Sequence, residues 1–390
     1  MIPVSEALAK VTALATLMPT ETVPLTEANG RVLAEPVVAT RNQPPFPASA
    51  MDGYAVRQAD VRSGATLDVV GEAPAGRAWT GTIASGQALR IFTGAVVPEG
   101  ADMVVIQENV TRDGARITIT DADSHGDNIR PAGGDFKPGD RIEAPRRLAP
   151  GDVALAAAMN VPLLRVRRRP VVAILATGDE LVMPGEAPRA DQIIASNSFG
   201  LKGMLEAAGA EVRMLPIARD TESSLRTAFE LATGADLVVT IGGASVGDHD
   251  LVGKVAGDLG MERSFYKVAM RPGKPLMAGR LNGAAMVGLP GNPVSAMVCG
   301  TIFLLPLVRA MLGLDAGPAP RTQATLACDI AANGPREHYM RAIVENGVVT
   351  PFRRQDSALL TVLASANALL VRPVADGPRS AGETVEVVAI

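Results

Sequence analysis

The middle of the chain alternates between apolar runs and amphipathic segments, and this alternation limits its possible folds most strongly. Residues 171–181, VVAILATGDEL, form a continuous apolar run that ends in a polar turn, as expected for a strand buried on both faces. Two further apolar runs, at 236–241 and 284–289, are separated from it by segments whose apolar residues recur at helical spacing. The pattern predicts a doubly wound α/β sheet that binds ligands at the carboxyl ends of its strands.

The regions around this sheet predict three further units. One contains short Thr- and Val-rich runs broken by glycine, including an Asp-Gly hairpin signal, and indicates an inserted β-domain. The segments on either side of it predict one small domain of helical and extended pieces, split in two by the insertion. The end of the chain, with an Asn-Gly hairpin signal, predicts a β-barrel. The predicted ranges are 1–40 with 137–168 for the split domain, 41–136 for the β-domain, 169–316 for the α/β domain and 317–390 for the barrel domain.

Composition excludes several classes of protein. The net charge is -4, with 37 Lys and Arg against 41 Asp and Glu, so the chain lacks the basic surface of a nucleic-acid-binding protein. Pro3 and Glu6 stand where a signal peptide needs a basic start and an apolar run. The longest apolar run, 296–308, is too short to cross a bilayer, and the 2 cysteines give no disulfide framework. We therefore expect a cytoplasmic protein with no nucleic-acid or membrane partner.

Four loops are predicted to meet at one edge of the α/β sheet, because they lie at strand ends. Their sequences are ATGDEL, GGASVGDHD, RPGKP and GLPGNPVS. The first two loops carry carboxylates, the third carries two cations, and the fourth carries two prolines that stiffen a turn. Cations and carboxylates at one sheet edge favour a functional site over four unrelated turns.

The second loop has the glycine spacing of a phosphate-binding loop but different residues at its C-terminal end. Gly242 and Gly247 have the spacing of such a loop, but Asp248, His249 and Asp250 follow in place of Lys and Ser or Thr. A phosphate and a carboxylate about 4 Å apart repel by roughly 4 kcal/mol at an effective dielectric constant near 20. A bridging divalent cation removes this conflict, and Mg²⁺ binds one or two carboxylates together with phosphate oxygens. The loop therefore predicts metal-assisted chemistry on a phosphate ester or anhydride.

Simpler interpretations stay open for single residues. The glycines fit a tight turn in which Asp248 or Asp250 caps the next helix, and Asp220 fits the N-cap of the helix after it. His249 has no partner at metal-ligand spacing and fits a solvated loop residue. Two other enzyme classes are disfavoured, because the chain has neither the glycine spacing of a dinucleotide-binding fold nor a G-x-S-x-G nucleophile motif.

Six motifs in order identify a resemblance. They are PPFPASAMDGYAV, TGAVVPEGADMVV, RPAGGDFKPGD, ATGDEL, GGASVGDHD and GLPGNPVSA, and over the full length the chain resembles the MoeA family, which includes the E-domain of gephyrin. The resemblance implies a molybdopterin molybdenumtransferase with an α/β domain of the molybdopterin-binding type. Such an enzyme inserts molybdate into adenylylated molybdopterin and releases AMP, assisted by a divalent cation, here expected to be Mg²⁺. It also implies a homodimer in which the α/β domain of one subunit and the β-domain of the other form each site.

The resemblance carries roles to individual residues. The implied catalytic residues are Asp52, Asp135, Asp250, Lys267 and Lys274. The implied metal ligands are Glu180, Asp220, Asp248 and Asp250. The implied substrate-binding residues are Thr93, Gly242, Gly243, Ser245, Gly247, Arg271, Pro290, Pro293, Arg341 and Ser357. Arg341 and Ser357 match positions that help receive the oxyanion.

Two other functions remain as alternatives at this point. Adenylyl transfer to molybdopterin uses the same type of α/β domain, and a related domain of gephyrin serves as a scaffold that anchors receptors. Release of AMP favours the insertion of molybdate, and consumption of ATP favours adenylyl transfer. The expected partners are a molybdopterin adenylyltransferase upstream and maturation factors of molybdoenzymes downstream.

Overall fold

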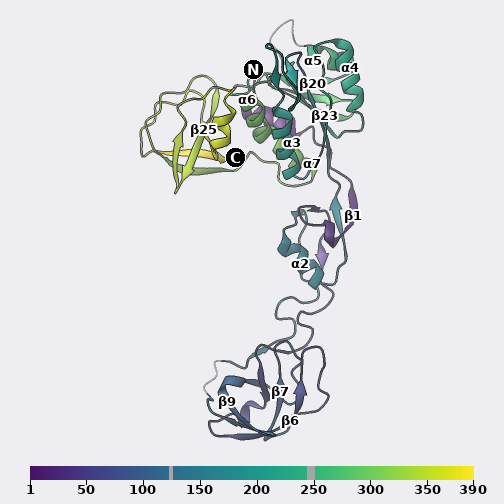
Figure 1. Ribbon diagram of the computed structural model, residues 1–390, viewed down its shortest axis with the longest axis vertical. Coiled ribbons are helices and arrows are strands. Elements are labelled where there is room, and N and C mark those ends of the chain that lie inside the picture. Colours follow the sequence, from purple (N-terminus) through teal and green to yellow (C-terminus); the bar gives the residue numbers. More distant parts are fainter. Residues whose placement is uncertain (123–125, 244–250) are drawn as a thin grey trace.

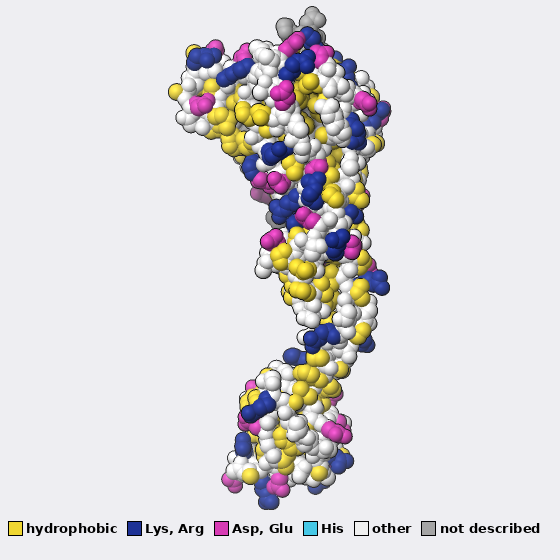
Figure 2. Space-filling model, turned by 90° about the vertical axis from the view of Figure 1, so that its right-hand side faces the viewer, with side chains coloured by type: hydrophobic (Ala, Val, Ile, Leu, Met, Phe, Trp, Pro, Cys, Tyr) yellow, Lys and Arg dark blue, Asp and Glu magenta, His cyan; other side chains and the backbone are white. Residues whose placement is uncertain are grey.

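The computed structural model describes residues 1–122, 126–243 and 251–390. The molecule is elongated, with the β-domain at one end and the α/β and barrel domains together at the other (Figure 1). The small split domain lies between them, and Figure 2 shows a narrow neck between it and the β-domain. These parts are the β-domain, the split domain, the α/β domain and the barrel domain, whose exact boundaries stay predictions.

The β-domain is built on a six-stranded sheet in the order β8-β5-β7-β6-β10-β9. The hairpin predicted from Asp113-Gly114 is confirmed, because β9 and β10 pair antiparallel; Asp113 pairs with Arg116, so the turn residues are Gly114, with a φ of 57°, and Ala115. Apolar side chains pack on both faces of this sheet, so the domain has a core of its own. Its strands are β4 Ala48–Ser49, β5 Gly53–Val56, β6 Thr66–Ala73, β7 Gln87–Ile91, β8 Met103–Ile106, β9 Val110–Asp113, β10 Arg116–Ile119 and β11 Ile129–Arg130.

The split domain is assembled from two segments far apart in the sequence. Its four-stranded sheet has the order β1-β14-β2-β13, and a further pair, β3 with β12, leads into the neck. Its elements are β1 Thr20–Pro24, β2 Val32–Leu33, β3 Val37–Val38, β12 Arg141–Ile142, β13 Arg146–Arg147, α2 Pro150–Ala158 and β14 Leu163–Arg167. The β-domain is therefore inserted between the two halves of this sheet.

The α/β domain has the predicted doubly wound sheet, in the order β18-β15-β19-β23-β22-β20. The first four strands are parallel, β22 is antiparallel to them, and β20, which pairs antiparallel with β22, runs in the same direction as the first four. One core cluster contains α1, α3, α6 and α7 on one face, and another contains α4 and α5 on the other face. The strands are β15 Val171–Ala176, β18 Glu211–Met214, β19 Leu237–Ile241, β20 Glu262–Tyr266, β22 Met277–Leu281 and β23 Ala284–Leu289. The helices that pack on this sheet are α1 Val4–Thr12, α3 Asn197–Ala207, α4 Glu222–Leu231, α5 Leu251–Asp258, α6 Pro293–Cys299 and α7 Leu305–Met311; α1 lies in the range predicted for the split domain but packs in the core of the α/β domain.

The long apolar segment Pro293–Met311 is a core helix of this domain. A π-helical segment, Gly300–Leu304, joins α6 to α7. Although the apolar run 296–308 alone is too short, the whole helix is long and apolar enough to cross a membrane, but 78% of its most apolar part is buried inside the fold. Its apolar residues are accounted for by packing against the sheet.

The barrel domain contains five strands in the order β25-β26-β24-β28-β27. The first and last of these strands, β25 and β27, also pair with each other, so the sheet is closed. The predicted hairpin is confirmed at Asn346 and Gly347, whose φ values of 49° and 78° suit a tight two-residue turn. A short strand from the α/β domain, β21 Met270–Arg271, adds to this sheet beside β25. The remaining elements are β24 Arg321–Leu326, β25 Glu337–Glu345, β26 Val348–Pro351, α8 Leu360–Ser365, β27 Ala368–Arg372 and β28 Thr384–Ala389.

Candidate active site

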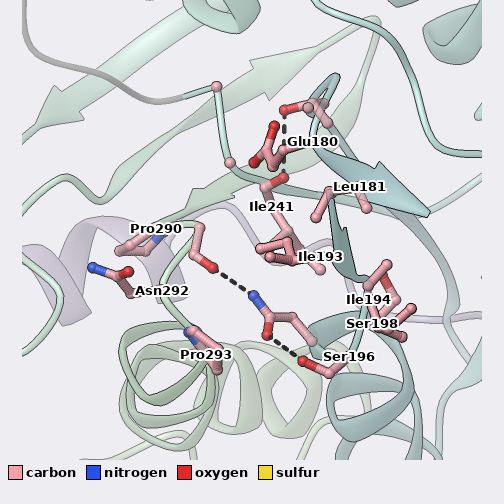
Figure 3. Close-up of a pocket in the computed structure, with 18 of the residues that line it drawn as sticks. Glu180, Leu181, Ile193, Ile194, Ser196, Ser198, Ile241, Pro290, Asn292 and Pro293 are labelled. Carbon is pink, nitrogen blue, oxygen red and sulfur yellow. Dashed lines mark hydrogen bonds between the residues drawn. The ribbon is translucent and has the colours of Figure 1, made fainter. Parts of the chain in front are cut away.

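A pocket with a volume of about 570 Å³ opens at the carboxyl ends of β15, β19 and β23. The loops that follow these three strands line it, which agrees with the sequence-based expectation. The RPGKP loop precedes its strand instead, but β22 is antiparallel to β23, so Pro275 reaches the same edge. Figure 3 shows Glu180 at one end of the pocket and Ser196 and Pro293 at the other, with Ile193 between them.

Six of the residues predicted for the site line this pocket. They are Glu180, Asp220, Gly242, Gly243, Pro290 and Pro293. The predictions for Ser245, Gly247, Asp248 and Asp250, and His249 with them, lie outside the described residues. Of the glycine loop, the first two residues, Gly242 and Gly243, line the pocket.

The two glycines at the start of that loop are required by close approach of the backbone. Gly242 has a φ of 88°, and a Cβ atom there would lie 2.7 Å from the carbonyl oxygen of Thr177. Gly243 has a φ of 63°, and its Cβ atom would lie 2.2 Å from Cγ2 of Val252. Local backbone geometry therefore explains the glycine pair at this turn, whereas the capping of the next helix by Asp248 or Asp250 lies outside the described residues. The same turn brings the backbone after β19 against the loop after β15.

Three carboxylates form an acidic corner at one end of the pocket. Partial burial raises the pKa of Asp220, and the negative charges of Asp179 and Glu180 raise it further. The carboxylate of Glu180 fills the space above Gly178, where a Cβ atom would lie 2.4 Å from its Oε2. A hydrogen bond from the backbone of Asp179 to the carboxylate of Asp220 lowers the pKa again, by less. Among the described residues, neither Glu180 nor Asp220 forms an ion pair with a cationic side chain, so their negative charges repel each other.

The capping interpretation of Asp220 is wrong. The N-cap of α4 is Thr221, whose side-chain oxygen accepts a hydrogen bond from the backbone N–H of Ser224 at 3.3 Å. The backbone N–H of Asp220 donates to Oδ1 of Asp179 at 3.2 Å. The carboxylate of Asp220 is therefore not used by the helix and faces the pocket.

We predict that Asp220→Asn raises the thermal stability of the ligand-free protein at pH 7. A raised pKa means that the charged form is disfavoured in the fold, and this penalty exists only above the pKa. Because the side chain is exposed and screened, the melting temperature should rise by only about 1 °C. Thermal unfolding followed by circular dichroism at several pH values measures the effect. The difference in melting temperature between the variant and the parent should shrink as the pH falls toward 3.8, the pKa of the carboxyl group in the unfolded chain. A gain that does not depend on pH would contradict the charge-based cause.

A second corner, beside the pocket, is cationic. Arg341 on β25 is fully buried, and its Nη2 donates to the carbonyl oxygens of Asp356 at 3.1 Å and Arg354 at 3.3 Å. Its Nε and Nη1 have no hydrogen-bond partner among the described residues. Burial lowers the pKa of Arg341, the carboxylate of Asp356 raises it, and the nearby charge of Arg271 lowers it. A buried guanidinium with two unused donor nitrogens has the properties of an anion site.

Neighbouring residues extend this cationic corner toward the pocket. Arg271 lies beside His338 in the β21–β25 pair, and burial together with nearby arginines lowers the pKa of His338 to about 4. His338 is therefore neutral at pH 7 and adds no charge. The carbonyl oxygen of Ser357 accepts a hydrogen bond at 3.0 Å from the backbone N–H of Val294, at the start of α6. This contact joins the loop around Arg341 to the pocket.

Two predicted lysines lie outside the pocket lining. Lys267 follows β20 with a φ of 69°, and its Nζ lies 4.8 Å from the centre of the Tyr266 ring. Lys274 accepts a hydrogen bond from the backbone N–H of Val268 through its carbonyl oxygen, at 3.0 Å. Both lysines belong to the segment that leads to Pro275, so they lie near the pocket along the chain.

The predicted residues of the β-domain form a separate group. Oδ1 of Asp52 accepts hydrogen bonds from the backbone N–H of Thr93 at 2.7 Å and from its hydroxyl at 2.8 Å. These bonds, with the charge of Arg90, lower the pKa of Asp52. Asp135 lies in the neck, where its backbone N–H donates to the carbonyl oxygen of Gln43 at 2.9 Å. The β-domain and the α/β domain lie at opposite ends of the molecule, so one chain does not bring these residues to the pocket (Figure 1).

The structure adds pocket residues that the sequence did not predict. Nδ2 of Asn197, at the start of α3, donates to the carbonyl oxygen of Gly291 at 2.7 Å and links two walls of the pocket. Ile193 and Ile194 form another wall from the short strand β17, Ile193–Ile194, which pairs with β16, Leu181–Val182. No spacing or composition marks these residues in the sequence. Asp179 could have been found, because it adjoins Glu180 in the same motif.

Comparisons with known proteins agree with this arrangement. Three family models match successive parts of the chain: the MoeA N-terminal region (domain I and II) at residues 2–160, a "Probable molybdopterin binding domain" at 173–310, and the MoeA C-terminal region (domain IV) at 323–390. A molybdopterin molybdenumtransferase from a Nostoc species is 36% identical over 95% of this chain and 89% of its own length. Another from Haemophilus influenzae is 37% identical over 94% of this chain and 93% of its own length.

A solved structure is also similar over the whole length. The molybdopterin biosynthesis moeA protein from Pyrococcus horikoshii OT3 has a TM-score of 0.84 and 29% identity, with 100% of both chains covered. The matched family regions, the relatives and the similar solved structure all point to the same family. The chain therefore belongs to the MoeA family, the molybdopterin molybdenumtransferases.

Proposed function

We propose that this protein inserts molybdate into adenylylated molybdopterin and releases AMP, with Mg²⁺ as the assisting cation. The observation that carries the proposal is the pairing of two opposite charge environments at one pocket. Among the described residues, Glu180 and Asp220 have no ion-pair partner at one end, and Nε and Nη1 of Arg341 have no hydrogen-bond partner beside the other. The proposed reaction needs both environments, because the carboxylates would hold the cation that binds the substrate phosphates and the guanidinium would bind the molybdate oxyanion.

The acidic corner fits a divalent cation. Its carboxylates Glu180 and Asp220 suit Mg²⁺, which binds one or two carboxylates and completes its shell with phosphate oxygens and waters. The described residues contain no group of three side chains placed to hold a metal, so the remaining ligands would come from the substrate, water and Asp248 or Asp250. When bound, Mg²⁺ would neutralise phosphate oxygens beside the bond that is cleaved.

The chain's own residues would position the substrate around this cation. Gly242 and Gly243 let the backbone approach the phosphates, and Pro290 and Pro293 shape the opposite wall. Lys267 and Lys274 would bind anionic groups of the substrate as point charges. Arg341, with Arg271 and Ser357, would receive molybdate, whose oxygens can accept from the unused nitrogens Nε and Nη1.

We also propose that the site is completed by a second copy of the chain. Asp52 and Thr93 are hydrogen-bonded to each other, but they lie at the far end of the molecule from the pocket. In a homodimer of elongated subunits, the β-domain of one copy would reach the pocket of the other, together with Asp135. We expect the dimer to act in the cytoplasm, between a molybdopterin adenylyltransferase and the factors that load molybdoenzymes.

The test is incubation of the purified protein with adenylylated molybdopterin, molybdate and Mg²⁺. We expect AMP and molybdenum-loaded molybdopterin in equal amounts. A chelator should reduce AMP release to background, and excess Mg²⁺ should restore it, because phosphates and carboxylates would otherwise meet unneutralised. Full activity after exhaustive chelation would contradict the role of Glu180 and Asp220 as metal ligands.

The same assay separates the alternative functions. Consumption of ATP when molybdopterin itself is supplied would indicate an adenylyltransferase. Absence of turnover in both reactions would indicate a scaffold.

A further inference from the structure

Arg219 connects the two loops that carry the acidic corner. It follows β18 and directly precedes Asp220. Its Nη1 donates to the carbonyl oxygens of Asp179 at 3.1 Å and Leu181 at 3.2 Å. These carbonyls lie on either side of Glu180, whose own carbonyl accepts from the backbone N–H of Ile193 at 2.8 Å. Three successive peptide groups around Glu180 are therefore held, and one side chain holds two of them.

Further backbone contacts lock the two loops together. The N–H of Gly178 donates to the carbonyl oxygen of Ala218 at 3.1 Å, and the N–H of Ala218 donates to that of Ala176 at 2.9 Å. The N–H of Arg219 donates to Oγ of Ser224 at 2.9 Å, so the residue is also fixed to the start of α4. The backbone of Arg219 is therefore held in place, and its guanidinium group reaches the loop after β15 from a fixed position.

The choice of acceptors is informative. Asp179, Glu180 and Asp220 all lie close to Arg219 in the chain or across the two loops, and an arginine next to a carboxylate usually forms an ion pair with it. Within the described parts of the chain, Arg219 forms no ion pair and uses its hydrogen bonds on carbonyl oxygens instead. The positive charge stays in the acidic corner, and within the described residues no cationic side chain occupies the oxygens of Glu180 and Asp220.

We propose that Arg219 is a positioning residue for the divalent cation: it fixes the backbone around Glu180 and sets the spacing between Glu180 and Asp220 without occupying their oxygens. This inference rests on the proposed function, because it requires a cation in the acidic corner. It goes further in assigning the geometry of that corner to a residue that touches neither substrate nor metal. Residues that orient metal ligands typically change metal affinity by 10- to 100-fold when they are replaced.

The sign of the effect distinguishes positioning from simple charge. Removal of a positive charge alone should tighten the binding of a cation, because repulsion between Arg219 and the metal is lost. Removal of a positioning group should weaken binding, because the two carboxylates no longer keep their spacing. The full chain is titrated with Mn²⁺ in the presence of saturating AMP, and free Mn²⁺ is measured by electron paramagnetic resonance.

We expect Arg219→Ala to raise the dissociation constant of Mn²⁺ at least about tenfold. Arg219→Lys keeps the charge but loses the planar guanidinium, and should give an intermediate value. In the AMP-release assay, the half-saturating Mg²⁺ concentration should rise while the turnover number at saturating Mg²⁺ changes little. The matched control is Arg189→Ala, since Arg189 is a nearby exposed arginine whose side chain pairs only with Asp191 among the described residues. It should bind Mn²⁺ as the parent does.

Unchanged or tighter Mn²⁺ binding by Arg219→Ala, with a normal melting curve, would overturn the role of Arg219 and leave the proposed function intact. If Arg219→Ala melts abnormally, Arg219→Lys decides in its place, and parental Mn²⁺ affinity in that variant would overturn the role. Absence of Mn²⁺ binding by the parent protein would overturn both the cation site and this inference.

Discussion

Mixing two inactive variants, Asp52→Asn and Glu180→Gln, is expected to restore activity to about a quarter of that of the parent protein. Asp52 lies in the β-domain and Glu180 at the pocket of the α/β domain, at opposite ends of one chain. If each site takes these domains from different subunits, a mixed dimer has one site with both defects and one site with neither. Random exchange gives roughly half mixed dimers, each with one working site of two. AMP release after subunit exchange is the measurement.

The matched control is a mixture of two variants with defects in the same domain. Asp52→Asn and Thr93→Ala both damage the β-domain, around one pair of hydrogen bonds. Every site of their mixed dimer then contains one damaged β-domain, so this mixture should stay inactive. If exchange of subunits is verified and the first mixture also stays inactive, each site lies within a single chain.

Arg341→Met is expected to weaken the binding of molybdate about 100-fold, which corresponds to about 2.8 kcal/mol. The guanidinium is fully buried, and two of its nitrogens have no partner among the described residues. Methionine retains much of the volume but no donor, so the oxyanion would lose its charged partner. Half-saturating molybdate in the AMP assay and calorimetric titration with molybdate both report the change.

The stability of Arg341→Met should stay close to that of the parent, because burial of an uncompensated charge is itself unfavourable. Arg372 provides the contrast, since it is equally buried but pairs with Asp376 and donates to two carbonyl oxygens. Breaking such a buried pair costs about 3 to 5 kcal/mol, so Arg372→Met should be strongly destabilised. Parental affinity for molybdate in Arg341→Met would remove Arg341 from the oxyanion site.

The sequence predicted those features that depend on local patterns. The apolar run at 171–176 became β15, buried on both faces, because an apolar run of that length fits only an internal strand of such a sheet. The two hairpins were predicted from Asp-Gly and Asn-Gly pairs, and the positive φ that a tight turn requires occurs at Gly114, Asn346 and Gly347. The meeting of the pocket loops followed from topology, because parallel strands end at the same edge.

Other features depend on contacts that leave no local signal. Arg271 meets His338 only because β21 joins a sheet whose other strands come from the last part of the chain. The capping interpretation of Asp220 failed because Thr221, one residue later, is an equally good cap by composition and has the backbone angles for it. The role of Arg219 depends on which oxygens its side chain contacts, and the sequence does not specify them.

The insertion of the β-domain also sets the order in which the chain can fold during synthesis. β1 must wait for β14, since Thr20 pairs with Arg167 and Pro24 with Leu163. Ribosomes add about 5 to 20 residues per second, so the first half of the split domain remains unpaired for roughly ten seconds. The whole β-domain emerges in this interval with a core of its own. A nascent chain therefore completes an inner domain before the outer one that surrounds it in the sequence, and the exposed edge of β1 is the segment that chaperones would have to protect meanwhile.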